Sequence, residues 1–96
     1  MNPSAPAGRA LFAAQTWNTI AASMRLSQRE FQIVLGIFDD RTEMLIATEL
    51  GISRHTVNTY LHRLYRKVGV ASRAQLIVRV MNEYLRLSGA AVVSGQ

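Results

Sequence analysis

Apolar residues recur three and four positions apart along most of the chain, which is the spacing of one face of an α-helix. A first helix is expected over residues 9–24, where the apolar stripe comprises Leu11, Ala14, Trp17, Ile20, Ala21 and Met24. The alternation of apolar and polar residues that marks a half-buried strand does not occur in the sequence. The pattern therefore predicts an all-α fold.

Capping residues mark the starts of four further helices, and glycine or an acidic pair marks the ends of three. The expected N-caps are Ser27, Thr42, Ser53 and Ser72, and the expected stops are Asp39-Asp40, Gly51 and Gly69. Glu30 and Gln75 each follow a capping serine by three residues, which predicts a capping box at both sites. The helix after Ser27 has one apolar face, formed by Phe31, Val34, Leu35 and Phe38, and the last helix is expected to bury Ala74, Ile77, Val80, Met81, Tyr84 and Leu85. These four helices are expected to form one domain over residues 25–87.

The two ends of the chain lack this periodicity. Residues 1–8 contain both prolines and are expected to form a disordered lead. Residues 88–96 are small, weakly patterned and bounded by glycine, which favours a flexible tail.

The helices that begin after Thr42 and Ser53 are separated by a turn of three residues that contains Gly51. A short turn with glycine between two helices is typical of a helix-turn-helix. Ala47 is small enough for the two helices to approach closely, and Val57 is placed to fill the angle between them. An ordinary α-hairpin would share this spacing, so the faces of the helix over 54–68 decide between the two.

One face of that helix is apolar, and the other is polar but carries no acidic side chain. Val57, Leu61, Leu64 and Val68 fall on one side, and His55, Asn58, Thr59, His62, Arg63 and Arg66 fall on the other. No Asp or Glu occurs between residues 54 and 82. A solvated helix face usually mixes both signs of charge, whereas this one offers hydrogen-bonding groups and cations suited to base edges and phosphates.

Composition narrows the class of protein. The chain has 96 residues, 49% of them apolar, with no cysteine and a net charge of +5. That length supports one small domain, and the charge suits a polyanionic partner. A disulfide scaffold is excluded, and because neither an export signal nor an apolar run of membrane length is present, no membrane association and a cytoplasmic location are expected.

Metal binding and catalysis are not expected. His55 and His62 share a helix face but are seven residues apart, and a zinc site usually needs three or four ligands. The sequence shows no Gly-rich phosphate loop and no assembled nucleophile, base and acid. We therefore expect no cofactor and no enzyme activity.

Five motifs follow one another in a fixed order and spacing from residue 26 onward: Leu26-Ser27-Gln28-Arg29-Glu30, Ile46-Ala47-Thr48-Glu49-Leu50-Gly51-Ile52-Ser53, Thr56-Val57, Lys67-Val68-Gly69-Val70 and Ser72-Arg73-Ala74-Gln75. With them, the sequence from residue 26 to about residue 84 resembles the LuxR-type (GerE-like) DNA-binding domain of bacterial transcription regulators. The resemblance implies a four-helix domain, here preceded by an additional N-terminal helix, whose third helix lies in the DNA major groove, usually in a dimer.

The resemblance also assigns residues to the interface with double-stranded DNA. The implied base contacts are His55, Asn58, Thr59 and His62. The expected contacts with the DNA backbone are Thr42, Ser53, Arg54, Thr56, Tyr60, Arg63, Arg66, Lys67 and Arg73. Asn58, Tyr60 and Arg63 stand where the family commonly has Lys, His and Asn, and Leu45 replaces a frequent Glu, so the family's familiar target sequence does not carry over.

The sequence thus favours a sequence-specific transcriptional regulator that reads the major groove with the helix over 54–68. A homodimer through the last helix, residues 77–85, is expected, with the Trp17 helix as a second candidate surface and RNA polymerase as a further candidate partner. Only about 25 residues precede the module, too few for a phospho-accepting receiver domain, and a cut from a longer regulator would look the same. Two alternatives stay open: a protein-interaction module that keeps this fold and holds another regulator through the Trp17 helix, and a sigma-factor-like promoter-binding region. The Trp17 helix has a simpler reading too, as a cover for apolar surface of the domain.

Overall fold

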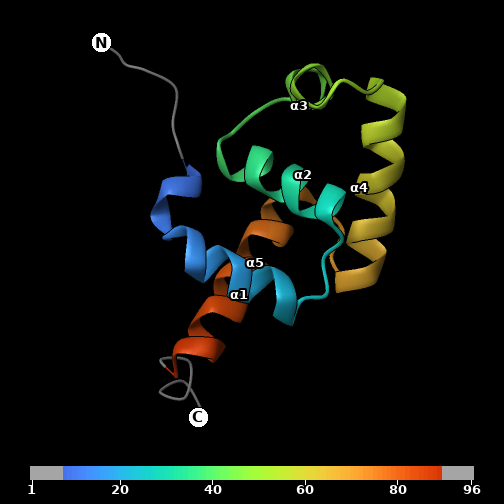
Figure 1. Cartoon of the computed structure of the whole chain (residues 1–96). Coiled ribbons are helices and arrows are strands. Elements are labelled where there is room, and N and C mark those ends of the chain that lie inside the picture. Colours follow the sequence, from blue (N-terminus) through green and yellow to red (C-terminus); the bar gives the residue numbers. More distant parts are fainter. Residues whose placement is uncertain (1–7, 90–96) are drawn as a thin grey trace.

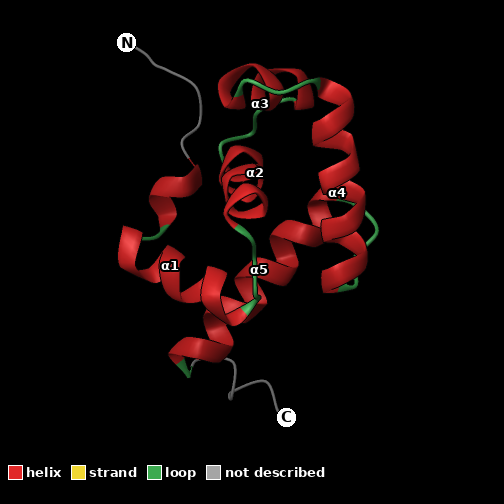
Figure 2. Ribbon diagram, turned by 45° about the vertical axis from the view of Figure 1, so that its right-hand side comes forward, coloured by secondary structure: helices red, strands yellow, loops and turns green. Residues whose placement is uncertain are grey.

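The structure, a computed structural model, describes residues 8–89 and is entirely helical over that range (Figures 1 and 2). Its elements are the 3-10 helix η1 (Gly8–Leu11) and the α-helices α1 (Ala14–Ser23), α2 (Gln28–Phe38), α3 (Glu43–Leu50), α4 (Arg54–Val68) and α5 (Arg73–Ser88). The predicted all-α fold is confirmed. The predicted lead and tail lie outside the described residues except for Gly8, Ser88 and Gly89, of which Ser88 still belongs to α5.

Local capping explains where the helices of the domain begin. Ser27 and Glu30 form the complete capping box that was predicted, because Ser27 Oγ accepts from Glu30 N at 3.1 Å and Glu30 Oε1 accepts from Ser27 N at 2.8 Å. The second predicted box is only half formed. Ser72 Oγ accepts from Gln75 N at 3.1 Å, but the Gln75 side chain accepts from Ala71 N instead of from Ser72 N.

The predicted helix over 9–24 is divided in two. Ala13 has an extended backbone and caps α1 without a side-chain hydrogen bond. The break turns Phe12 inward, where its ring lies 4.6 Å from that of Tyr84 and 5.0 Å from that of Trp17. Leu11 is left 67% exposed. The prediction that Leu11 and Ala14 belong to the buried stripe is therefore wrong, because aromatic packing of Phe12 outweighs a continuous helix.

A buried carboxylate holds η1 against the end of α2. Asp39 accepts from the backbone N of Arg9 at 2.8 Å and from Arg9 Nε at 2.5 Å. The indole of Trp17 donates to the carbonyl oxygen of Arg9 at 2.6 Å. Asp39, which the sequence pattern identified only as a helix stop, thus fixes the N-terminal segment to the domain.

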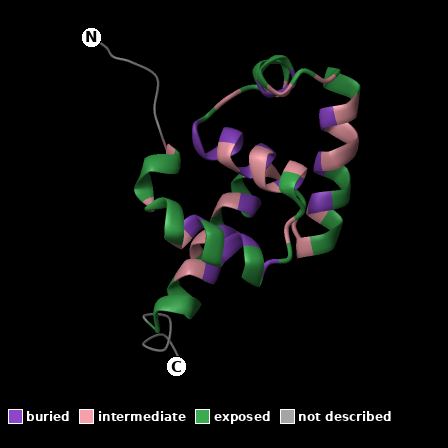
Figure 3. Cartoon of the chain, viewed as in Figure 1, coloured by how far each residue is buried: buried purple, intermediate pink, exposed green. Residues whose placement is uncertain are grey.

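The core is built around α2, which packs against η1, α4 and α5 (Figure 1). The side chains with almost no exposed surface are Ile20, Ile33, Val34, Ile37, Ile46, Val57, Leu64, Leu76 and Val80. The side chain of Ile46 from α3 packs on Gly36 of α2, where a Cβ atom would lie 2.8 Å from Cγ1 of Ile46. Figure 3 shows that buried residues lie on the inward sides of the helices and exposed residues on the outward side of α4.

The buried face of α5 differs from the predicted stripe. Val80 is fully buried as expected, but Ala74 and Leu85 are exposed, which corrects the prediction. Leu76 and Glu83 are buried instead. The reason is that α5 packs against α1, α2 and α4, so more than one side of this helix is covered and a single stripe cannot describe it.

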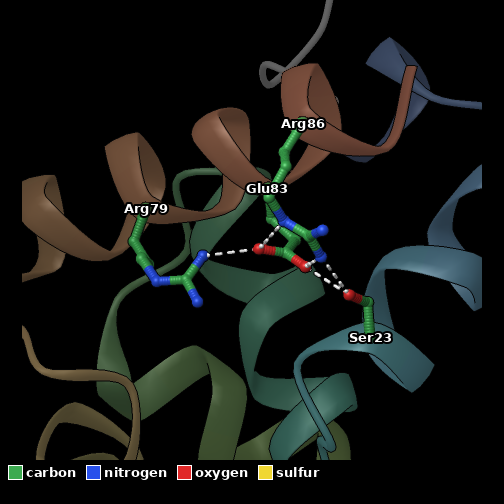
Figure 4. A network of polar contacts seen from close by, with 4 residues as sticks. All are labelled: Ser23, Arg79, Glu83 and Arg86. Carbon is green, nitrogen blue, oxygen red and sulfur yellow. Dashed lines mark hydrogen bonds and ion pairs between the residues drawn. The ribbon is translucent and has the colours of Figure 1, made fainter. Parts of the chain in front are cut away.

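Glu83 is a buried carboxylate that joins α5 to the end of α1 (Figure 4). Its Oε1 accepts from Arg79 Nη1 at 2.9 Å, and its Oε2 accepts from Arg86 Nη2 at 2.5 Å and from the Ser23 hydroxyl. The hydrogen bonds from Arg86, Ser23 and Arg79 outweigh burial and lower the pKa of Glu83 from 4.5 to about 2. The network thus stabilises the charged form.

Replacing Glu83 with glutamine is expected to lower the free energy of unfolding at pH 7 by about 2 kcal/mol. The pKa difference alone corresponds to about 3 kcal/mol, and water around the partly exposed arginines reduces it. Because the folded pKa is depressed, this stability is present above pH 4.5 and is lost as the pH falls toward 2. Urea unfolding between pH 7 and pH 2 measures it, with the exposed Glu49→Gln as control. Equal pH profiles for wild type and Glu83→Gln would contradict the expected result.

Candidate nucleic-acid interface

Helices α3 and α4 form the predicted helix-turn-helix. Leu50 ends α3 and Arg54 begins α4, and Gly51 between them has φ +69°, a left-handed conformation that glycine adopts without strain. The backbone N of Ile52 donates to the carbonyl oxygen of Ala47 at 3.0 Å and closes the turn. Ala47 and Val57 are both buried, as their sizes predict. Figure 2 shows α3 at the end of the molecule where α4 begins, and the two helices pack against each other.

The outer face of α4 carries the predicted base-reading side chains. His55 and His62 are exposed, and Asn58 and Thr59 are half-buried. The hydroxyl of Thr59 donates to the carbonyl oxygen of His55, one turn earlier in the same helix, at 3.1 Å. The structure thus brings the four predicted base contacts together on one side of one helix.

Three arginines of α4 form no side-chain hydrogen bond or ion pair within the described residues. Arg54, Arg63 and Arg66 are exposed, and no ion pair or hydrogen bond joins their guanidinium groups to any of residues 8–89. A cation with no internal partner can neutralise a phosphate without first breaking a contact.

Two other predicted cations are engaged within the chain. Lys67 Nζ lies 2.9 Å from Glu30 Oε1 and also donates to the carbonyl oxygen of Arg25. Burial raises the pKa of Glu30, but hydrogen bonds from Lys67 and Ser27 outweigh it and give a net lowering. Arg73 donates to the carbonyl oxygen of Arg41. Both side chains therefore tie α4 and α5 to other elements of the fold.

The predicted hydroxyl contacts lie at helix starts. Thr42 Oγ1 accepts from Leu45 N at 3.1 Å and caps α3. Ser53 Oγ accepts from Thr56 N at 3.0 Å and caps α4, and the two hydroxyls of Ser53 and Thr56 lie 2.8 Å apart. Amide groups at the start of a helix favour a nearby anion.

Tyr60, a predicted contact with the DNA backbone, lines a groove beside α4 whose other residues were not predicted from the sequence. The other lining residues are Ser27, Gln28, Arg29 and Gln32, from the start of α2. Gln28 is exposed, and Arg29 and Gln32 are half-buried and lie 3.2 Å apart, Nη1 to Oε1. The signal that could have found them is their place among the polar positions of α2, next to the capping box.

An acidic residue also reaches the edge of this face. Glu43, the first residue of α3, accepts from Asn58 Nδ2 through Oε1 at 3.2 Å. Burial raises the pKa of the Tyr65 hydroxyl on the same flank of α4, with Arg73 opposing this rise and Glu43 adding to it. Glu43 was not predicted from the sequence, because the prediction considered only α4, which has no acidic residue, whereas Glu43 belongs to α3.

Residues 8–89 contain no group of three or more His, Cys, Asp or Glu side chains that could hold a metal ion. Within the same range no helix is both long enough and apolar enough to cross a membrane.

Known proteins resemble the chain over this domain. The family model described as bacterial regulatory proteins, luxR family, matches residues 24–80. The chain is similar to the HTH-type transcriptional regulator MalT of Vibrio campbellii, of Vibrio parahaemolyticus and of Serratia proteamaculans, with 36% identity over 64 residues in each case. These matches cover 67% of this chain and 7% of each relative. No solved structure matches the chain. LuxR-type helix-turn-helix domains bind DNA and are not enzymes. Because the family model matches more than half of the chain, the chain belongs to the luxR family of bacterial regulatory proteins, with its DNA-binding domain at residues 24–80.

Proposed function

We propose that the chain regulates transcription in the cytoplasm by reading a specific DNA sequence with the outer face of α4 in the major groove. The base contacts are His55, Asn58, Thr59 and His62, whose imidazole, amide and hydroxyl groups can hydrogen-bond with base edges. The single observation that carries the proposal is that these side chains share one helix face with Arg63 and Arg66, two exposed cations that have no partner in the described chain.

The phosphate contacts fall into two groups in this proposal. Arg54, Arg63 and Arg66 supply most of the electrostatic affinity because they are exposed and uncommitted. The remaining proposed contacts are Thr42, Ser53, Thr56, Tyr60, Lys67 and Arg73. Lys67 and Arg73 rank second among the cations because each already donates within the chain.

A dimer through the outer side of α5 completes the proposal. Val78 is 58% exposed and lies in a shallow, largely apolar surface, whose other lining residues are Val70, Ala74, Gln75, Arg79 and Asn82. A second copy of the chain would cover this surface and place two α4 helices on a two-fold symmetric site. The predicted contact with RNA polymerase stays a prediction.

The Trp17 helix, α1, has a role in packing rather than in pairing two chains. Trp17 is only 4% exposed and packs against Phe38 and Phe12. The helix therefore covers apolar surface of its own domain, the simpler of the two readings of the sequence. The interaction-module alternative would have to use the exposed side of this helix, because Trp17 itself is buried in the domain.

Selection of bound duplexes from a random pool at two salt concentrations tests the proposed function. We expect an enriched motif with two-fold symmetry. We also expect an affinity that falls steeply with salt, with a slope of log affinity against log salt of about 0.9 for each phosphate neutralised. A pool without an enriched motif would contradict sequence-specific reading.

Two variants in the same experiment separate base reading from phosphate binding. His62→Ala is expected to cost about 1 to 2 kcal/mol of discrimination at one position of the motif. Arg66→Ala is expected to weaken all duplexes alike and to reduce the salt slope by about 1. Equal losses of specificity from both changes would show that these residues are assigned to the wrong roles.

A further inference from the structure

Asn58 lies at the edge of the outer face of α4, where that face meets the start of α3. Its side-chain nitrogen donates to Glu43 Oε1 at 3.2 Å, and both side chains are half-buried. A carboxylate can only accept hydrogen bonds, so the amide nitrogen of Asn58 must face Glu43. The amide oxygen, Oδ1, is then the end of the group that points away from Glu43.

Glu43 is well placed to keep this orientation. It is the first residue of α3, directly after the Thr42 cap, and a negative charge is stabilised at the start of a helix. An amide without such a neighbour turns over freely and can offer either a donor or an acceptor to a base. With Glu43 in place, the free end of Asn58 is an acceptor.

The orientation has a consequence for the bases that Asn58 can read. In the major groove, adenine and cytosine carry an exocyclic amine, whereas guanine and thymine carry a carbonyl oxygen. An acceptor on Asn58 pairs with the amine and is repelled by the carbonyl oxygen. The second amide hydrogen can also donate to N7 of adenine.

We propose that Glu43 is a positioning residue for base reading, which holds the Asn58 amide so that one position of the target must present an exocyclic amine. This inference rests on the proposed function, since it assigns a specificity to the same helix. It also accounts for a carboxylate beside a surface that meets phosphates, where a charge alone would weaken DNA binding.

Duplex selection with the full chain and with Glu43→Gln tests this proposal. Glutamine is close in size to glutamate but can donate as well as accept, so the Asn58 amide is free to turn over. We expect wild type to prefer adenine or cytosine over guanine or thymine about tenfold at one position. We expect Glu43→Gln to reduce this preference to about twofold there, with the rest of the motif unchanged.

Two controls separate orientation from charge and from folding. Glu49→Gln removes the same charge from α3 but changes a residue whose ion-pair partner is Arg41, at 3.3 Å, so the base preference should stay as in wild type. In an Asn58→Ala background the effect of Glu43→Gln on base preference should vanish, because the two residues act as a pair. Thermal unfolding of each variant verifies that the fold is kept.

The outcomes distinguish the two levels of the argument. A wild-type motif that Glu43→Gln leaves unchanged, or a uniform loss of affinity without a change of base, overturns the role of Glu43 and leaves the proposed function standing. The same change of base preference with Glu49→Gln also overturns it. A wild-type pool without any enriched motif overturns sequence reading itself, and this inference with it.

Discussion

Replacing Trp17 with alanine is expected to lower the free energy of unfolding by about 4 kcal/mol. The indole is almost completely buried, and its ring meets those of Phe12 and Phe38 edge-on, with centroids 5.0 and 4.8 Å away. Truncation leaves a large cavity and removes the hydrogen bond from Nε1 to the carbonyl oxygen of Arg9. Domains of this size often have a free energy of unfolding of only about 5 to 10 kcal/mol, so a large share of the stability would be lost.

Urea unfolding followed by far-ultraviolet circular dichroism measures this loss. Leu11→Ala is the matched control because Leu11 lies in the same N-terminal segment but is largely exposed, and a change below about 0.5 kcal/mol is expected for it. Similar small losses for both variants would show that η1 and α1 are an appendage rather than a part of the core.

Replacing Ala47 with leucine is expected to cost about 3 kcal/mol and to weaken DNA binding as well. Ala47 is buried between α3 and its neighbours, and its carbonyl oxygen accepts from Ile52 N in the turn. Space is already short on this side of α3, since Ile46 meets Gly36 of α2 closely. Three extra carbon atoms would push α3 and α4 apart and change the direction of α4 relative to the rest of the domain.

Thermal unfolding and duplex affinity, measured on the same protein, test this expectation. Thr48→Leu serves as the stability control, because Thr48 is the next residue on α3 and is exposed. A stable Ala47→Leu variant with wild-type affinity would show that close approach at this residue is not required.

The features that could be predicted from the sequence are the local ones. Each of the four predicted N-caps binds the amide three residues later, and Gly51 and Gly69 end their helices through their own backbone conformation. The faces of α4 follow from a period that a single helix imposes on itself. Local signals therefore predicted α2 to α5, the turn and the composition of the outer face of α4, but not the break at Ala13.

Contacts between elements could not be predicted in the same way. Arg9 and Asp39 are 30 residues apart, and Lys67 and Glu30 are 37 apart. Whether such charges meet depends on the angles at which helices pack, which no single helix period determines. For this reason the sequence predicted Lys67 only as a contact with the DNA backbone, without its ion pair with Glu30, and did not connect Glu43 with Asn58.

The position of Glu83 couples two events that sequence alone treats as unrelated. Its bond with Ser23 helps to dock α1 on α5, while Val78 of the same α5 lies in the proposed surface between two copies. Docking of α1 and pairing of chains then stabilise one and the same helix. By thermodynamic linkage, any effect of α1 docking on chain pairing is matched by an equal effect of chain pairing on α1 docking. The Ser23–Glu83 bond is therefore the place where a change in α1 would be transmitted to the paired chains and to the DNA site that they occupy.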